Sequence, residues 1–410
     1  MKKRNILNPK ILFIIITSVY LLLNLTVMND YGVTWDFSYH INAGLYHLHL
    51  PPINNYKFTM FASNPLPDIL PTLSHILFFE KLKILSFDSA YNLISIFMGS
   101  LGVGVLYLFV SELINQPTGI VAALTLAFLP RYFGHLHNNM KDILQSVLFT
   151  ICLWLFYRYN KTNKISYLLI SSVFFALLLL TKINALFIPI IIMIWSFFPP
   201  INKISKKLIR ITSFLFLGIL LALSVWLNIW DKPFYWLKEN FQTYFSSTIN
   251  MPVLYYKNIY FSGVNIPWHY PLGMLFATTP VLVSVTFLIG LIILINKILH
   301  KDKASFLIFL WFVIPLLRFL KPHMLVIDDI RHFMEVVFPF ATISSIGMVG
   351  ILKHIHKIID KSWRNISLYL LTGGYFTYLI FQVITFHPFQ TSYFNEIEKP
   401  LMQKTSQFDA

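Results

Sequence analysis

The chain has 410 residues, of which 56% are hydrophobic and 12% are charged, and its formal net charge is +15. Soluble domains carry about 25% charged residues, so this composition excludes an ordinary soluble protein and indicates an integral membrane protein. The positive charge does not indicate nucleic-acid binding, because Lys and Arg gather in short segments between apolar runs, as in the cytoplasmic loops of membrane proteins. The single cysteine, Cys152, lies inside an apolar run and can form no internal disulfide.

Apolar runs of membrane-spanning length recur from end to end of the chain. The first follows the basic segment MKKR and lacks a small-residue cleavage site, so we expect a retained helix and not a removed signal peptide. We predict an all-α transmembrane bundle of about eleven spans, using 20 residues per crossing, in one domain over residues 1–410. The predicted spans are 11–28, 91–113, 118–133, 143–158, 165–181, 183–198, 209–230, 271–296, 304–320, 331–352 and 366–386.

The distribution of basic residues predicts the orientation of these spans. Lys and Arg gather before residue 11 and in four short loops, at 158–164, 203–210, 297–303 and 353–364. This bias predicts a cytoplasmic N-terminus in the cytoplasmic (inner) membrane. The unusual polar clusters then fall on the extracytoplasmic side, in a first outer loop (29–90), an aromatic outer loop (231–270) and a short tail (387–410). Within the first loop, the proline-interrupted segment 66–85 is expected to lie at the interface and not to cross.

The segment RYFGHLHNNMKD, Arg131 to Asp142, places several polar groups at the end of an apolar run. Such groups cost roughly 2.5–3.5 kcal/mol each at membrane depth, which favours a functional use. Lys141 is a compact cation suited to a phosphate oxygen, while His135 and Asn138 are candidate positioning groups. The alternative is helix capping, with an asparagine at the N-cap and Asp142 in the first turn, but capping accounts for only one or two of these residues.

The first outer loop contains a second candidate group. In a helix from Trp35 to His47, the side chains of Asp36, His40 and His47 share one face. Asp36 could act as a general base or coordinate a divalent cation, or it could simply cap an interfacial helix. A zinc site that also includes His49 is conceivable, although the spacing matches no known zinc signature.

Three further segments carry candidate residues. Lys182 either snorkels to the outer surface or meets an anion. Trp268 and His269, between two prolines in IPWHYP, could line a pocket for a sugar or lipid head group, although most aromatics of this loop are expected to form an interfacial belt. Arg331, followed by His332, suits a phosphate, or it pairs with a carboxylate at 328, 329 or 335.

Five segments together resemble the GT-C superfamily of integral membrane glycosyltransferases, in the branch of the protein O-mannosyltransferases and the lipid A aminoarabinose transferases. They are WDFSYHINAG, HNNMKD, TKINALFIP, PWHYP, and RHFMEVVFP followed by HPFQTSYFN. They extend from Trp35 to Asn395, nearly the whole chain. The resemblance implies a polyprenyl-phosphate-linked sugar donor and transfer on the outer side of the membrane, with inversion at the anomeric carbon. The acceptor would be a protein, a lipid or a glycan.

The resemblance also implies residue roles. Asp36 corresponds to the first-loop acid that serves as base or metal partner, and Asp142 to the second-loop acid. A divalent cation, Mg or Mn, would bind at these two residues. Lys141, Lys182 and Arg331 would hold the carrier phosphate. The chain departs from the pattern in two places: Phe37 follows Asp36 where many relatives carry a second acid, and further helices or an outer domain would be expected after HPFQTSYFNEIEKP.

These observations predict a glycosyltransferase. A lipid-linked sugar phosphate is already activated, so the enzyme must position an acceptor, remove a proton and neutralise the departing phosphate. A lipid-linked sugar flippase or transporter is the alternative, but the inner halves of the predicted spans are mostly apolar, which counts against a polar path across the membrane. An inactive scaffold of an envelope assembly is a third hypothesis.

Overall fold

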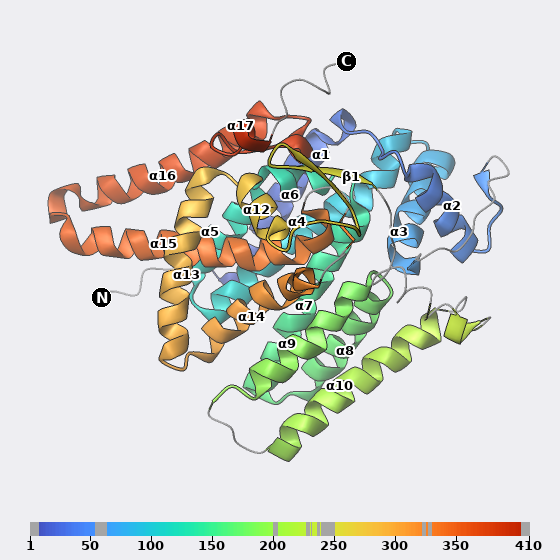
Figure 1. Cartoon of the computed structure of the whole chain (residues 1–410), viewed down its shortest axis with the longest axis horizontal. Coiled ribbons are helices and arrows are strands. Elements are labelled where there is room, and N and C mark those ends of the chain that lie inside the picture. The colour runs from blue at the N-terminus through green and yellow to red at the C-terminus, as the bar shows by residue number, and fades with distance from the viewer. Residues whose placement is uncertain are drawn as a thin grey trace.

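The computed structural model describes residues 8–53, 64–199, 204–226, 230, 232–235, 238, 251–321, 325–326 and 330–402. Helices dominate the fold (Figure 1), with short 3₁₀ segments at 28–30, 183–186, 318–320, 331–336 and 390–392 and a π-helical turn at Ile76–Lys81. The helices are α1 (Pro9–Thr26), α2 (Phe37–His47), α3 (Pro65–His75), α4 (Phe87–Leu113), α5 (Gln116–Ala127), α6 (Pro130–His135), α7 (Met140–Thr162), α8 (Ile165–Leu179), α9 (Phe187–Ser196), α10 (Ile204–Val225), α12 (Tyr270–Ala277), α13 (Val281–Leu299), α14 (Lys303–Leu317), α15 (Val337–Ile358), α16 (Lys361–Thr385) and α17 (Lys399–Met402).

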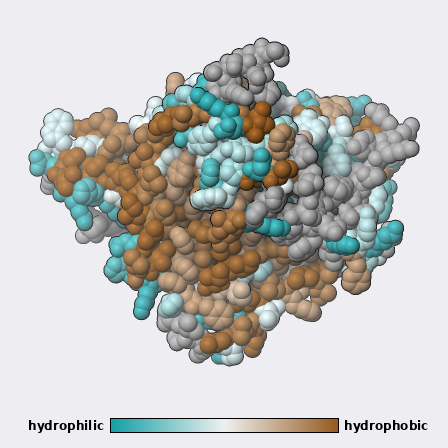
Figure 2. Space-filling model, viewed as in Figure 1, coloured by the Kyte–Doolittle hydropathy of each residue, from teal (hydrophilic) through white to brown (hydrophobic). Residues whose placement is uncertain are grey.

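The predicted all-α membrane architecture is confirmed. Among the described residues, 8 helical segments are long and apolar enough to cross a membrane. Shorter apolar helices at Gln116–Ala127, Ile165–Leu179 and Ile183–Ser196 lie where three further spans were expected, so the count of about eleven stays a prediction. Figure 2 shows a broad hydrophobic surface over α13 and the helices beside it, as expected of a lipid-facing exterior.

Small residues allow the spans to approach closely. A Cβ atom added to Gly290 of α13 would lie 1.8 Å from the carbonyl oxygen of Ile343, and one added to Gly347 of α15 would lie 1.9 Å from the carbonyl oxygen of Thr286. Beside this contact, the hydroxyl of Thr286 lies 2.6 Å from that of Ser344. Helices of membrane bundles typically approach closely at glycines and pair hydroxyl groups across the interface, because lipid provides no hydrophobic driving force for their association.

Three helices connect the basic loops to the opposite end of the bundle. α7 begins at the polar segment of residues 131–142 and ends at the basic loop of residues 158–164, from which α8 returns towards Lys182. α15 begins beyond Arg331 and ends in the basic segment of residues 353–364. The polar groups that the sequence marked as candidates therefore gather at the end of the bundle away from these loops.

The first outer loop folds as two packed helices. α3 continues into the π-helical turn Ile76–Lys81, and neither is among the described segments long and apolar enough to cross; their interfacial or re-entrant position stays a prediction. α2 packs on α3 at Gly44, where a Cβ atom would lie 2.1 Å from Oγ1 of Thr72 and 2.4 Å from the carbonyl oxygen of Asp68. Only glycine fits this contact, so Gly44 fixes α2 against α3.

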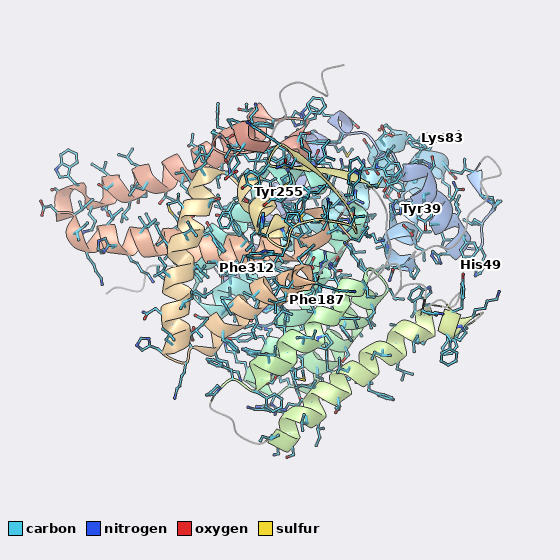
Figure 3. All side chains as sticks on the ribbon, in the orientation of Figure 1. Tyr39, His49, Lys83, Phe187, Tyr255 and Phe312 are labelled. Atoms are coloured by element: carbon cyan, nitrogen blue, oxygen red, sulfur yellow. The ribbon has the colours of Figure 1, made fainter. Side chains whose placement is uncertain are left out.

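The described part of the aromatic loop contains a β-hairpin, which the sequence analysis did not predict. β1 (Pro252–Tyr255) pairs antiparallel with β2 (Asn258–Phe261) in a two-stranded sheet. Tyr256 and Lys257 form the turn with φ values of 48° and 63°, the backbone of a tight hairpin turn. Tyr255 lies beside α12 (Figure 3) and packs on Gly273. Four of the loop's predicted aromatics, Trp236, Phe241, Tyr244 and Phe245, lie outside the described residues.

The chain after α16 folds back against the first loop. Nε2 of His387 lies 2.8 Å from Oδ2 of Asp30, and the hydroxyl of Tyr31 donates to Oε1 of Gln390 at 2.7 Å. Nδ2 of Asn395 donates to two carbonyl oxygens at the end of α12, at 2.7 and 2.9 Å. The segment predicted as a short outer tail is thus fixed to the bundle up to α17, and residues 403–410 lie outside the described part.

Candidate active site

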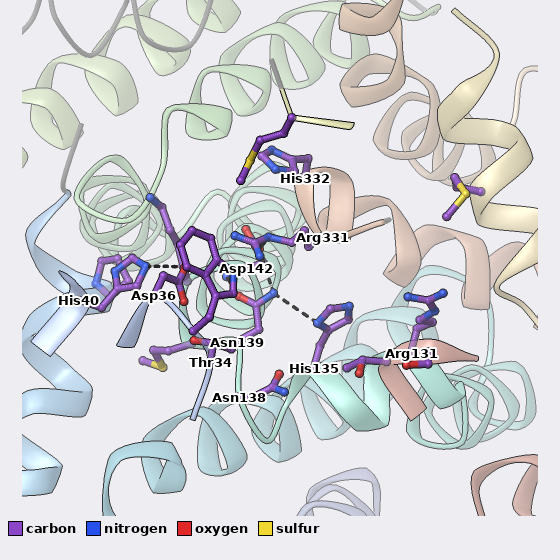
Figure 4. Close-up of a pocket in the computed structure, with 18 of the residues that line it drawn as sticks. Thr34, Asp36, His40, Arg131, His135, Asn138, Asn139, Asp142, Arg331 and His332 are labelled. Atoms are coloured by element: carbon purple, nitrogen blue, oxygen red, sulfur yellow. Dashed lines mark hydrogen bonds and ion pairs between the residues drawn. The ribbon is translucent and has the colours of Figure 1, made fainter. Parts of the chain in front are cut away.

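One large cavity of about 880 Å³ opens where the first loop, the ends of the spans, the hairpin and the C-terminal segment meet (Figure 4). It is built from residues far apart in the chain. Its lining consists of Thr34, Trp35, Asp36, His40, Pro67, Asp68, Tyr91, Arg131, His135, Asn138, Asn139, Met140, Lys141, Asp142, Lys182, Met251, Pro252, Val253, Leu254, Tyr270, Met274, Arg331, His332, Thr391, Ser392 and Phe394.

Asp36 stands at the N-terminus of α2 and faces His40 one turn later (Figure 4). Nε2 of His40 lies 3.4 Å from Oδ2 of Asp36, while Nδ1 lies 2.7 Å from Oδ1 of Asp68 on α3. Burial lowers the pKa of His40, but the two carboxylates outweigh it and raise that pKa to about 9. His40 is therefore an imidazolium at neutral pH, held between two carboxylates.

The electrostatics of Asp36 keep its carboxylate ionised. Burial raises its pKa, but hydrogen bonds from His40 and Thr34, together with the charges of His40 and Arg331, outweigh burial and lower the pKa below its usual range. The side chain retains 21% of its exposure, so an acceptor in the cavity can reach it. Asp36 is therefore an ionised carboxylate that is accessible from the cavity.

Asp142 is more enclosed, with 4% side-chain exposure, and its carboxylate is already engaged. Nζ of Lys182 donates to Oδ1 at 2.5 Å, and Nδ2 of Asn139 donates to Oδ2 at 2.9 Å. The side chain of Asn139 in turn accepts from the backbone N–H of Asp142 at 3.3 Å, so the capping interpretation is correct for these two residues. Lys182 is buried against Asp142 and does not snorkel to the surface.

Two cations remain directed at the cavity. Lys141 is partly exposed, and no carboxylate within the described residues pairs with it. Nε of Arg331 lies 3.8 Å from Oδ2 of Asp142, a contact that leaves 29% of the arginine side chain exposed. The alternative partners of Arg331 at positions 328 and 329 lie outside the described residues. Lys141 and Arg331 thus both line the cavity, while Lys182 is buried against Asp142.

A buried network supports the segment that carries Arg331 and His332. Nδ2 of Asn184 donates to Oε1 of Glu335 at 2.8 Å, and Nη1 of Arg318 donates to Oδ1 of Asn184 at 3.1 Å. Both Asn184 and Arg318 also donate to the carbonyl oxygen of His332. The network fixes the backbone from which His332 and its neighbour line the cavity.

The cavity contains most of the residues singled out from the sequence, but not all of them. Asp36, His135, Asn138, Lys141, Asp142, Lys182, Arg331 and His332 line it. Trp268 and His269 do not: the indole is 63% exposed, and Nδ1 of His269 lies 3.0 Å from the hydroxyl of Tyr255 behind the hairpin. Their neighbour Tyr270 lines the cavity instead, because the turn into α12 directs the two preceding side chains outward.

Several lining residues were not predicted from the sequence. The sequence position of Asp68 indicates only an acid in the first turn of a helix. The packing of α3 on α2 is what brings its carboxylate to His40. Arg131 belonged to a marked segment, and its Nε donates to the carbonyl oxygen of Tyr393 at 3.0 Å. The hairpin residues 251–254 and the C-terminal residues 391–394 carried no local signal of a site.

Within the described residues, no group of three or more His, Cys, Asp or Glu side chains could hold a metal ion, so the arrangement does not support the zinc set of Asp36, His40, His47 and His49. A divalent ion bridging Asp36 and Asp142 would compete with the ammonium of Lys182 and with His40. Binding of Mg or Mn stays a prediction, and no step of the reaction proposed below depends on it.

Comparison with known proteins places the chain in a structural context. Residues 79–230 match the family model described as dolichyl-phosphate-mannose-protein mannosyltransferase. No curated protein sequence is significantly similar to the chain. The archaeal oligosaccharyltransferase AglB from Archaeoglobus fulgidus, in complex with an inhibitory peptide and a dolichol-phosphate, aligns with 94% of this chain at 12% identity and a TM-score of 0.64. The chain spans 56% of the length of that protein.

ArnT from Cupriavidus metallidurans, bound to undecaprenyl phosphate, aligns with 93% of this chain and 75% of its own, at 10% identity and a TM-score of 0.63. The shared architecture covers nearly the whole chain, and the family match covers α4 to α10 together with the second-loop acid. These findings confirm the resemblance inferred from the sequence motifs: the chain is a multi-pass membrane protein with the GT-C glycosyltransferase fold.

Proposed function

We propose that this protein is a glycosyltransferase that moves a sugar from a polyprenyl-phosphate carrier to an acceptor at the outer face of the cytoplasmic membrane. One observation carries the proposal: a single cavity presents the accessible carboxylate of Asp36 together with the cations Lys141 and Arg331. These groups are the ones that the transfer requires. The polyprenyl phosphates bound to AglB and ArnT, and the mannosyltransferase family match, support the same donor class.

The proposed reaction is a displacement at the anomeric carbon. An acceptor oxygen or nitrogen attacks that carbon from the face opposite the carrier phosphate, so the configuration inverts. The bond between the anomeric carbon and the phosphate oxygen breaks, and its electron pair leaves with the phosphate. The proton of the acceptor passes to the carboxylate of Asp36 as the new bond forms. Lys141 and Arg331 neutralise the charge that develops on the phosphate.

The other polar residues act through these groups. His40, itself fixed by Asp68, holds the carboxylate of Asp36 in place. Asp142 positions Lys182 and the side chain of Asn139, and its engaged carboxylate fits a positioning role better than proton transfer. Such fixed geometry is what makes a displacement between two bound reactants efficient.

The orientation of the chain supports action on the outer side. The cavity lies at the helix ends opposite the four basic loops, and basic loops mark the cytoplasmic side by the positive-inside rule. A polyprenyl-linked donor displayed on the outer leaflet would present its phosphate at this level.

Mass spectrometry of products tests the proposal. Purified protein in liposomes is incubated with a panel of polyprenyl-phosphate sugars and with protein, lipid and glycan acceptors. The expected result is a product heavier than one acceptor by one sugar residue, and free polyprenyl phosphate in equal amount. Movement of the intact donor across the bilayer without any product would support the flippase hypothesis instead and would overturn the proposal.

A further inference from the structure

An edge of the β-hairpin borders the cavity. Four consecutive residues, Met251 to Leu254, line it, and three of them belong to β1. Successive side chains of a strand point to opposite faces of the sheet. If one face of the hairpin bordered the cavity, only every second residue of β1 would line it. Contact by consecutive residues means that the backbone edge of β1 faces the cavity.

The register shows which backbone groups point outward along this edge. Tyr255 and Asn258 flank the two-residue turn and form a hydrogen-bonded pair, and the backbone N–H of Ser262 donates to the carbonyl oxygen of Met251 at 3.0 Å. Hydrogen-bonded pairs alternate along an antiparallel ladder, so Met251, Val253 and Tyr255 face β2. The carbonyl of Pro252 and both backbone groups of Leu254 face away from it, and they meet no hydrogen-bond partner in the described part of the chain.

The hairpin is held firmly enough to serve as a template. Tyr255, the last residue of β1, is 1% exposed, and the tyrosine hydroxyl lies 3.0 Å from Nδ1 of His269. The hydroxyl of Ser262, just after β2, accepts from the backbone N–H of Val326 at 3.0 Å. Proline at position 252 suits an edge strand, because its missing N–H would otherwise lack a partner.

We propose that the acceptor is an extended polypeptide segment that adds to the outward-facing edge of β1 as a third strand. This inference rests on the proposed function and names its acceptor class and docking surface. Outward-facing N–H and C=O groups at strand spacing are complementary to a peptide backbone, which offers the same groups at the same spacing. A sugar or a lipid head group has no such repeat. The edge and Asp36 line the same cavity, so a hydroxyl-bearing side chain of the bound strand can face the carboxylate.

Backbone methylation of the acceptor tests the docking surface. Random heptapeptides with one central threonine are offered with the donor that gives product, and the best acceptor is resynthesised with a single N-methyl group at each position in turn. Methylation at residues whose N–H faces β1 should raise the acceptor KM roughly three- to ten-fold, the size of one net backbone hydrogen bond. Methylation at the intervening residues should leave it unchanged, and absence of this alternation would overturn the inference.

Two variants of one residue test the protein side. Leu254→Pro removes the outward N–H of the edge, while Leu254→Ala keeps the backbone and serves as the matched control. The alanine variant reports the loss of the side chain alone, so the proline variant should raise the acceptor KM about ten-fold above that of the alanine variant, with the donor KM equal in both. If the proline variant does not fold, slowed hydrogen exchange of the Leu254 amide in the parent protein on peptide addition supplies the same readout, and unchanged exchange contradicts the inference.

These experiments distinguish a failure of the strand-addition site from a failure of the proposed glycosyltransferase function. Transfer to a glycan or a lipid but to no peptide would refute the strand-addition site and leave the proposed glycosyltransferase standing. Absence of product with every donor and acceptor would refute the proposed function, and the inference with it.

Discussion

The buried pair of Lys182 and Asp142 gives a prediction whose size follows from the geometry. Their charged atoms lie 2.5 Å apart, with side-chain exposures of 10% and 4%. Removing one partner of a buried pair costs about 3–5 kcal/mol, because the other charge stays buried without compensation. For Lys182→Met we expect the lower end, about 3 kcal/mol, because Arg331 remains 3.8 Å from Asp142 and compensates part of the charge.

The double variant distinguishes pairing from two independent losses. Lys182→Met with Asp142→Asn leaves no charge unpaired, so its free energy of unfolding should exceed the additive expectation by about 2–3 kcal/mol. The assay is SDS-driven unfolding of detergent-solubilised protein, followed by tryptophan fluorescence. The partly exposed pair Arg158–Glu112, 3.1 Å apart with side-chain exposures of 32% and 28%, serves as control and should couple by less than about 1 kcal/mol. Purely additive losses at Lys182 and Asp142 would show that this ion pair does not organise the site.

Three further predictions address the cation, the loop and the pH dependence. Lys141→Met should raise the KM for the lipid-phosphate donor at least ten-fold without changing the melting temperature. The control variant Lys297→Met, at the opposite end of the bundle, should change neither quantity. Equal effects of both variants would contradict a phosphate role for Lys141. Gly44→Ala should destabilise the packing of α2 on α3 by about 1–3 kcal/mol, seen as faster hydrogen exchange in both helices, because the new Cβ would overlap the α3 backbone. The pKa of His40 is raised from 6.5 to about 9, so its contribution to stability is complete below pH 6.5 and is lost as the pH rises through 9. The melting temperature should fall over that interval, and an identical pH profile for His40→Gln would refute the assignment.

The sequence predicted those parts of the structure that local patterns encode. Apolar runs predicted the helices, and the cost of polar groups at membrane depth marked Lys141, Asp142 and Lys182. Charge bias placed these residues at the same end of the bundle as Asp36. Their convergence on one cavity followed because adjacent antiparallel spans return the chain to the same level.

The sequence did not predict the contacts that depend on packing between distant segments. Asp68 reaches His40 only because Gly44 lets α3 approach α2, a contact that no local pattern encodes. Residues 251–254 join the site through a hairpin whose turn, Tyr256 and Lys257, contains no glycine or asparagine to signal it. Trp268 was favoured for its place between two prolines at a helix start, but the turn into α12 directs it away from the cavity.

In the proposed sugar-transfer reaction, Asp36 carries the proton transfer. The most direct measurement is single-turnover transfer by the parent protein, Asp36→Asn and Asp36→Glu, with the donor and acceptor pair that gives product. The asparagine variant should bind donor with unchanged affinity and melt normally but lose transfer by at least a hundred-fold, the usual size of a general-base contribution, and the glutamate variant should recover part of it. Transfer by Asp36→Asn at the parent rate would contradict a proton-transfer role for Asp36.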